Sequence, residues 1–129
     1  VPAGASEPAV AFALPFAGMG LWGPIKGVLA LEPDLQTIRG LRFYQQEETP
    51  GLGGEIDAEW FVGQFKGKKI VSAAGAPGFR LVKKGTTLDE NSVDAITGAT
   101  MTSDRVQSIL RDAAGKVAAE RSSRHGRNE

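Results

Sequence analysis

The first half of the chain carries apolar residues in the short runs and alternations that are typical of β-strands. The segment from Leu21 to Leu31 is mostly apolar and contains Pro24, and the segment from Gln36 to Gln46 alternates in part between apolar and polar residues. Pro33 and Asp34, which lie between the two segments, favour a turn. The pattern predicts an antiparallel hairpin of two strands, the first of them buried and kinked near Pro24.

The middle of the chain predicts shorter elements. Apolar residues at near-helical spacing predict a short amphipathic helix over residues 55–65, with aromatic side chains that pack on the sheet. Short strands are expected from Lys69 to Ala73 and from Phe79 to Lys83, and Asp94 to Met101 is expected to form a loop of small side chains.

The C-terminal part has the apolar periodicity of an α-helix. We expect this helix to begin with Thr102 or Ser103 as its N-cap and to run for about four turns, with the chain beyond Glu120 as a polar tail. The apolar positions recur at i, i+3, i+4, i+7 and i+11, namely Val106, Ile109, Leu110, Ala113 and Val117.

These elements together predict an α+β fold, with a small twisted and mainly antiparallel sheet flanked by helices. A chain of 129 residues is long enough for one hydrophobic core. We assign residues 1–17 to an N-terminal extension, residues 18–120 to a single domain and residues 121–129 to the polar tail.

The composition excludes several classes of site. Fifteen basic residues balance fifteen acidic ones, so we expect no nucleic-acid partner. The chain has no cysteine and a single histidine, His125, which excludes thiolate chemistry, a histidine-based metal centre and a catalytic triad. The longest apolar stretch, from Ala9 to Ala17, is far shorter than the ~20 residues that span a bilayer.

Residues 18–23 match the dinucleotide-binding pattern G-x-G-x-x-G, which requires a preceding strand and a helix that opens within the motif. Here Pro24 and a β-rich run follow, so we interpret the glycines as turn or close-approach positions. Trp22 within this stretch is either a core aromatic residue or a flat wall for a planar ring.

The segment from Asp94 to Ser103 is the most informative for chemistry. On its residues alone it is either a small-residue turn leading into a capped helix or an anion site. The free N–H groups at a helix start favour a phosphate, and Gly98 and Ala99 have no bulk to block its approach. A threonine hydroxyl beside such a site could accept a phosphoryl group.

The residues Asp94, Thr97, Gly98, Ala99 and Thr100 resemble the motif D-x-x-[S/T]-G-A-T of the FMN-binding domain family. The resemblance extends to Gly-Leu-Trp at 20–22 and Glu-Thr-Pro-Gly-Leu-Gly-Gly-Glu at 48–55, which look most like the C subunit of sodium-translocating NADH:quinone reductases. The G subunit of the Rnf complexes shares much of the pattern. The chain departs from the family in its short segment between Lys69 and Asp94 and in its basic tail.

The resemblance implies a cofactor and its site. FMN would be attached through its phosphate to the hydroxyl of Thr100 by a phosphoester bond, and the chain itself would supply neither a catalytic residue nor a metal. The residues implied around the phosphate are Thr97, Gly98, Ala99 and Thr102, and those implied around the isoalloxazine ring are Leu21, Trp22, Glu48, Thr49, Leu52 and Gly53.

The resemblance also implies a setting. The domain would carry electrons within a respiratory complex of the bacterial cytoplasmic membrane, on its outer, periplasmic face, with an N-terminal anchor that this chain lacks. Its partners would be the other subunits of the complex and a flavin transferase that uses FAD and magnesium. The domain would then be the acceptor of the modification and not its catalyst.

Several alternatives stay open. A noncovalent flavin-binding module and a purely structural subunit of a membrane complex both fit a small-residue loop. An enzyme that uses Thr100 as a nucleophile would need an adjacent general base, and no histidine or cysteine is near it. Asp94 either fixes the loop by accepting backbone N–H bonds or contacts the transferase and its magnesium.

Overall fold

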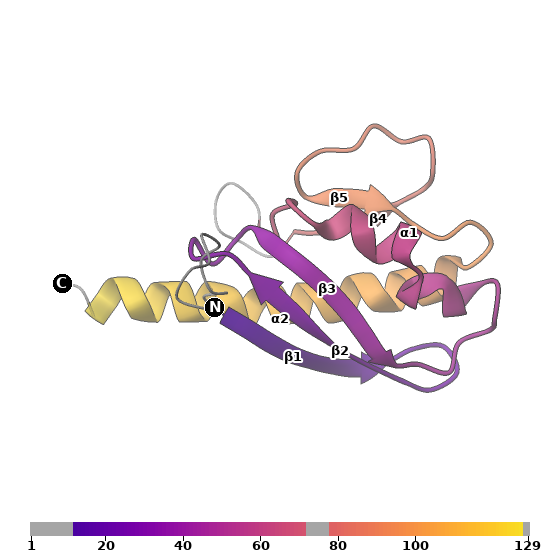
Figure 1. The fold of residues 1–129 in the computed structure, drawn as a ribbon, viewed down its shortest axis with the longest axis horizontal. Coiled ribbons are helices and arrows are strands. Elements are labelled where there is room, and N and C mark those ends of the chain that lie inside the picture. Colours follow the sequence, from indigo (N-terminus) through magenta and orange to yellow (C-terminus); the bar gives the residue numbers. More distant parts are fainter. Residues whose placement is uncertain (1–11, 72–77, 128–129) are drawn as a thin grey trace, which may run out of the picture.

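The computed structural model of the chain describes residues 12–71 and 78–127, and from Arg121 on it describes only the course of the helix. Its main sheet contains three antiparallel strands in the order β1-β2-β3 (Figure 1). The strands are β1 (Phe12–Met19), β2 (Pro24–Leu31) and β3 (Ile38–Gln45).

Strands β2 and β3 form the predicted hairpin. At its turn the carboxylate of Asp34 accepts hydrogen bonds from the backbone N–H groups of Gln36 and Thr37. The hairpin and its turn are confirmed. The first strand begins at Pro24 and not at Leu21, because residues 20–23 form a tight turn closed by the bond from the Gly20 N–H to the Gly23 carbonyl. The glycine pattern is therefore a hairpin turn, as interpreted from the sequence, and not a dinucleotide fingerprint.

Strand β1 is an edge strand that pairs with β2 along its whole length, from Phe12 opposite Leu31 to Met19 opposite Pro24. An edge strand tolerates the proline at position 15, which lacks an N–H donor. Phe16 is buried and packs edge-on against Phe43. The sheet thus includes residues 12–17, which the sequence placed in an extension, and residues 1–11 lie outside the described part.

The helix expected over residues 55–65 consists of three short segments: the 3₁₀ helix η1 (Gly53–Asp57), the helix α1 (Glu59–Val62) and the 3₁₀ helix η2 (Gly63–Phe65). Phe61 and Phe65 are fully buried, whereas Trp60 stays 49% exposed. The prediction that the aromatic residues of this segment pack on the sheet is therefore wrong for Trp60.

A small second layer contains two parallel strands, β4 (Arg80–Val82) and β5 (Ser92–Asp94). Strand β4 lies within a predicted segment, but β5 was missed because three residues are too few to show a periodicity. Of the other predicted strand, Lys69 makes an isolated bridge to Thr37, and residues 72 and 73 lie outside the described part.

The helix α2 (Thr100–Arg127) runs along one face of the main sheet, and its C-terminal end projects beyond the sheet (Figure 1). Its five predicted apolar positions are all buried. The helix begins earlier than expected, since the Ser103 N–H already donates to the Ala99 carbonyl. Thr102 and Ser103 are therefore not N-caps, and the helix continues through residues 121–127, which were assigned to a tail. None of the described helices is both long and apolar enough to cross a membrane.

Candidate functional site

A pocket of about 330 Å³ lies at the start of α2, where three segments that are distant in sequence meet. The segments are the turn between β1 and β2, the loop between β3 and η1, and the first turn of α2. Nine of the eleven residues that the sequence placed around FMN line it. The full lining is Leu21, Trp22, Thr49, Leu52, Gly53, Gly98, Ala99, Thr100, Met101 and Thr102.

Two of the expected residues lie elsewhere. Thr97 is exposed and lines two neighbouring pockets, one of which is also lined by Gly98 and Thr100. Glu48 is only 4% exposed and lies behind the residues that line the pocket, and its side chain is hydrogen-bonded to some of them. Sequence reasoning missed Met101, which lines the pocket and is 57% exposed. The only signal that could have found it is its place next to Thr100.

The backbone around the pocket has the shapes that small residues permit. Gly98 has a φ of 80°, in the left-handed region, which allows the chain to turn sharply into α2. Gly51 has a φ of 79° at the tip of the opposite loop, where the Thr49 carbonyl accepts bonds from the N–H groups of Leu52 and Gly54. The loop between β3 and η1 is thus folded on itself and presents Leu52 to the pocket.

The chemistry of the lining suits a phosphorylated planar ring. The first hydrogen bond of the α2 ladder comes from Ser103, so the N–H groups of Thr100, Met101 and Thr102 precede that ladder and favour an anion. On the other walls Trp22 is 67% exposed and Leu52 is 44% exposed, and both present apolar surface. The pocket therefore pairs an anion-binding end with an apolar wall.

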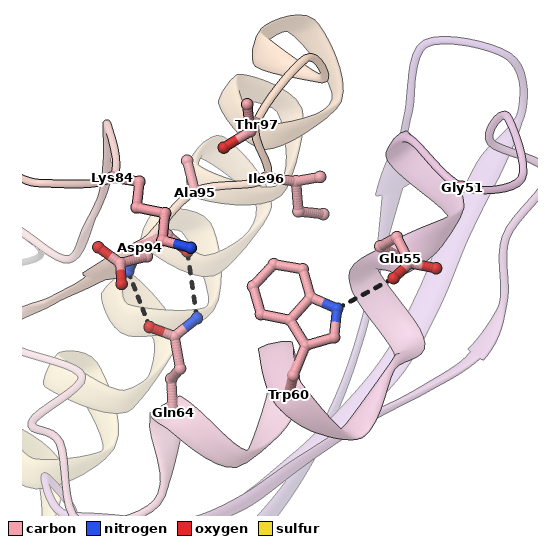
Figure 2. Close-up of a pocket in the computed structure, with 9 residues that line it drawn as sticks. All are labelled: Gly51, Glu55, Trp60, Gln64, Lys84, Asp94, Ala95, Ile96 and Thr97. Carbon is pink, nitrogen blue, oxygen red and sulfur yellow. Dashed lines mark hydrogen bonds between the residues drawn. The ribbon is translucent and has the colours of Figure 1, made fainter.

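A second pocket, of about 450 Å³, is lined by Asp94 at the end of β5 and residues 95–97 of the loop before α2, together with Gly51, Glu55, Trp60, Gln64 and Lys84 (Figure 2). The Gln64 amide clamps the backbone of Asp94: its oxygen accepts from the Asp94 N–H at 2.9 Å and its nitrogen donates to the Asp94 carbonyl at 3.2 Å. The Trp60 ring lies in the middle of the pocket, and its N–H donates to the Glu55 carboxylate at 3.0 Å. The two hydrogen bonds between the Gln64 amide and the Asp94 backbone were not predicted from the sequence.

The comparison with protein families shows to which family the domain belongs. The model of the FMN-binding domain family matches residues 20–115. The chain belongs to the FMN-binding domain family. This membership confirms the resemblance seen in the sequence, and it makes FMN the cofactor of the domain.

This FMN-binding domain is similar to the C subunits of Na(+)-translocating NADH-quinone reductases. It is 42% identical to that of Pasteurella multocida over 98 residues, which are 76% of this chain and 38% of that protein. It is 43% identical to that of Neisseria meningitidis serogroup B over 94 residues, which are 73% of this chain and 36% of that protein. The domain thus spans less than half the length of these curated relatives.

Solved structures agree with the sequence comparisons. The crystal structure of NqrC from Shewanella oneidensis matches with a TM-score of 0.73 at 41% identity, over 77% of this chain and 46% of that one. The crystal structure of the corresponding reductase subunit from Parabacteroides distasonis matches with a TM-score of 0.75 at 39% identity, over 82% of this chain and 54% of that one. The predicted α+β fold with a small antiparallel sheet is confirmed.

Proposed function

We propose that this domain carries FMN covalently on Thr100, through a phosphoester bond, and transfers electrons within a membrane-bound complex of the NADH:quinone reductase or Rnf type. The observation that carries the proposal is the position of Thr100. Its exposed side chain lies in the first turn of α2, at the anion-binding end of the pocket that Trp22 and Leu52 line from the other side.

Different residues of the pocket would bind the phosphate and the ring of FMN. The backbone of Gly98, Ala99, Thr100 and Thr102 would hold the phosphate, and Thr97 would flank it from the adjoining pocket. Leu21, Trp22, Thr49, Leu52 and Gly53 would contact the isoalloxazine ring and exclude water from one of its faces. The flavin supplies the redox chemistry when bound, and the chain sets its position and surroundings.

An external enzyme is the proposed source of the attachment. Formation of the bond from Thr100 Oγ to phosphorus needs a base for the hydroxyl proton, and no histidine or cysteine lies in the 94–103 segment. A flavin transferase with FAD and magnesium meets this need: the Oγ–phosphorus bond forms, the pyrophosphate bond to AMP breaks, and AMP leaves. The transferase is therefore one proposed partner.

The other proposed partners are the remaining subunits of the complex, and the proposed location is the periplasmic face of a bacterial cytoplasmic membrane. This part of the proposal rests on the similarity to the C subunits of Na(+)-translocating NADH-quinone reductases. An electron carrier with a half-exposed apolar rim, formed by Trp22, Leu52 and Met101, suits contact with a second redox protein.

Denaturation of the purified domain tests the proposal. After co-expression with a flavin transferase, the domain should gain the mass of one FMN less one water, and the flavin should stay with the denatured chain. Release of all flavin on denaturation would favour noncovalent binding. A domain without flavin under these conditions would favour a purely structural role.

Asp94 gives a separate prediction about the transferase. Within the described residues its carboxylate accepts no hydrogen bond, and Gln64 holds only its backbone, which asparagine offers equally well. We therefore expect Asp94→Asn to leave the melting temperature unchanged and to slow FMN incorporation strongly, because the charge acts on the transferase. Glu59→Gln, a carboxylate outside the pocket, is the matched control. Normal incorporation kinetics in Asp94→Asn would contradict a contact with the transferase.

A further inference from the structure

We propose that Glu48 is the positioning residue of the flavin pocket, and that its ionised carboxylate holds the Leu21–Trp22 turn against the first turn of α2. The assignment of flavin to this pocket rests on the function proposed above. The hydrogen bonds by which Glu48 joins the Leu21–Trp22 turn to α2 do not rest on that function, because they are present in the protein without cofactor.

The carboxylate of Glu48 connects all three segments of the site. One oxygen accepts the Leu21 N–H and the Thr102 hydroxyl, both at 2.8 Å, and the other accepts the Trp22 N–H at 2.9 Å. Glu48 itself belongs to the loop between β3 and η1, where its own N–H donates to the Gln46 side chain. Three donors from two other segments therefore converge on one side chain that does not line the pocket.

The packing around this carboxylate requires glycine at two positions. A Cβ at Gly20 would lie 2.9 Å from the carboxyl carbon of Glu48, and a Cβ at Gly53 would lie 2.5 Å from the Thr102 hydroxyl oxygen. Glu48 and Thr102 are both buried, so neither can move aside freely. The turn, the loop and the helix approach each other closely only because these residues have no side chains.

The three donors require an acceptor with two oxygens and no hydrogens. A neutral carboxyl or an amide would turn an N–H or O–H toward one of them and leave a buried donor unsatisfied. Burial raises the pKa of the Glu48 carboxyl, but the bonds from Trp22, Leu21 and Thr102, together with the Arg105 guanidinium, outweigh it and hold the pKa below its usual value of 4.5. The carboxylate is therefore the form that builds the pocket.

This arrangement links the shape of the pocket to pH. The charged residues that reach this region are Arg105 from α2 and Glu47 from the loop, whose side chain lies against Gly23. Since the pKa is lower in the folded chain, the stabilisation is fully present above the unfolded pKa and is lost as the pH falls through the folded value. As the pH falls through the folded pKa of Glu48, the turn that carries Trp22 should separate from α2.

Glu48→Gln tests the inference in the domain without flavin, with Glu47→Gln as the matched control. At pH 7 the folding equilibrium constant of Glu48→Gln should fall at least about tenfold, and the difference from the unsubstituted domain should shrink as the pH falls below about 4.5. In a Trp60→Phe background Trp22 is the sole tryptophan, and its fluorescence anisotropy should drop in Glu48→Gln. Glu47→Gln should change neither quantity.

Unchanged Trp22 anisotropy in Glu48→Gln, or a stability deficit that does not vary with pH, would overturn the positioning role. A failure of the unsubstituted domain to take up flavin would count against the proposed function alone, because both readouts are made without cofactor. Thr102→Val, which removes one of the three donors, should lower the stability and the Trp22 anisotropy in the same direction but by less. If Thr102→Val changed neither quantity, the effect of Glu48→Gln would not arise from these three hydrogen bonds.

Discussion

Thr100→Ala should abolish covalent flavin completely, so that the co-expressed domain shows no gain in mass. The substitution removes the one hydroxyl that is both exposed and in the first turn of α2. Thr102 is an unsuitable substitute as acceptor, because it is buried and its hydroxyl donates to Glu48. Stability should change little, since an exposed position in the first turn of a helix makes few contacts.

A matched control is Thr49→Ala, which removes a hydroxyl that lines the same pocket from the opposite wall. It lies outside the 94–100 segment and should retain covalent flavin. Mass spectrometry of the intact and the protease-digested domain measures both variants. Covalent flavin on Thr100→Ala, or a flavin-bearing peptide that does not contain residue 100, would refute attachment at this residue.

Nine of the eleven site residues implied by the resemblance to the FMN-binding domain family line one pocket, because the resemblance rests on short motifs that form two of its walls. The glycines of the 48–54 loop and the small residues before α2 indicate special backbone shapes, whichever fold surrounds them. The role of Glu48 was not visible in this way. Its three hydrogen bonds connect residues 26, 27 and 54 positions away along the chain, and no local pattern carries such contacts.

Some of the errors in the fold have the same origin. Strand β5 exists because Arg80–Val82 lies beside it, and the helix start moved forward to Thr100 because Thr102 and Ser103 bond to Glu48 and to the Ile96 N–H instead of capping. Trp60 remained exposed because its N–H bonds to Glu55 at the edge of the second pocket. For β5 and for Thr102 a contact between residues distant in the sequence overrode a local preference, whereas the bonds of Ser103 and Trp60 reach only seven and five residues along the chain.

Phe65→Ala should cause the largest loss of stability, about 3–5 kcal/mol of unfolding free energy. Phe65 is fully buried between Phe79, on which it stacks at 5.3 Å, and Phe61, which it meets edge-on at 5.3 Å. Removal of the ring leaves a cavity among rigid aromatic neighbours that cannot close it. Denaturant unfolding should show a lower midpoint with an unchanged slope.

The same substitution links folding to modification. Phe65 follows Gln64, whose amide clamps Asp94, so the aromatic stack supports the segment that leads to Thr100. Trp60→Ala removes a ring of similar size from the same helical stretch, but this ring is half exposed and its loss should cost much less. If Phe65→Ala and Trp60→Ala lowered the unfolding free energy equally, the stack would not be part of the core. Where Phe65→Ala is still folded, it should take up FMN more slowly than Trp60→Ala, because the lost ring no longer supports Gln64 and the segment that Gln64 binds.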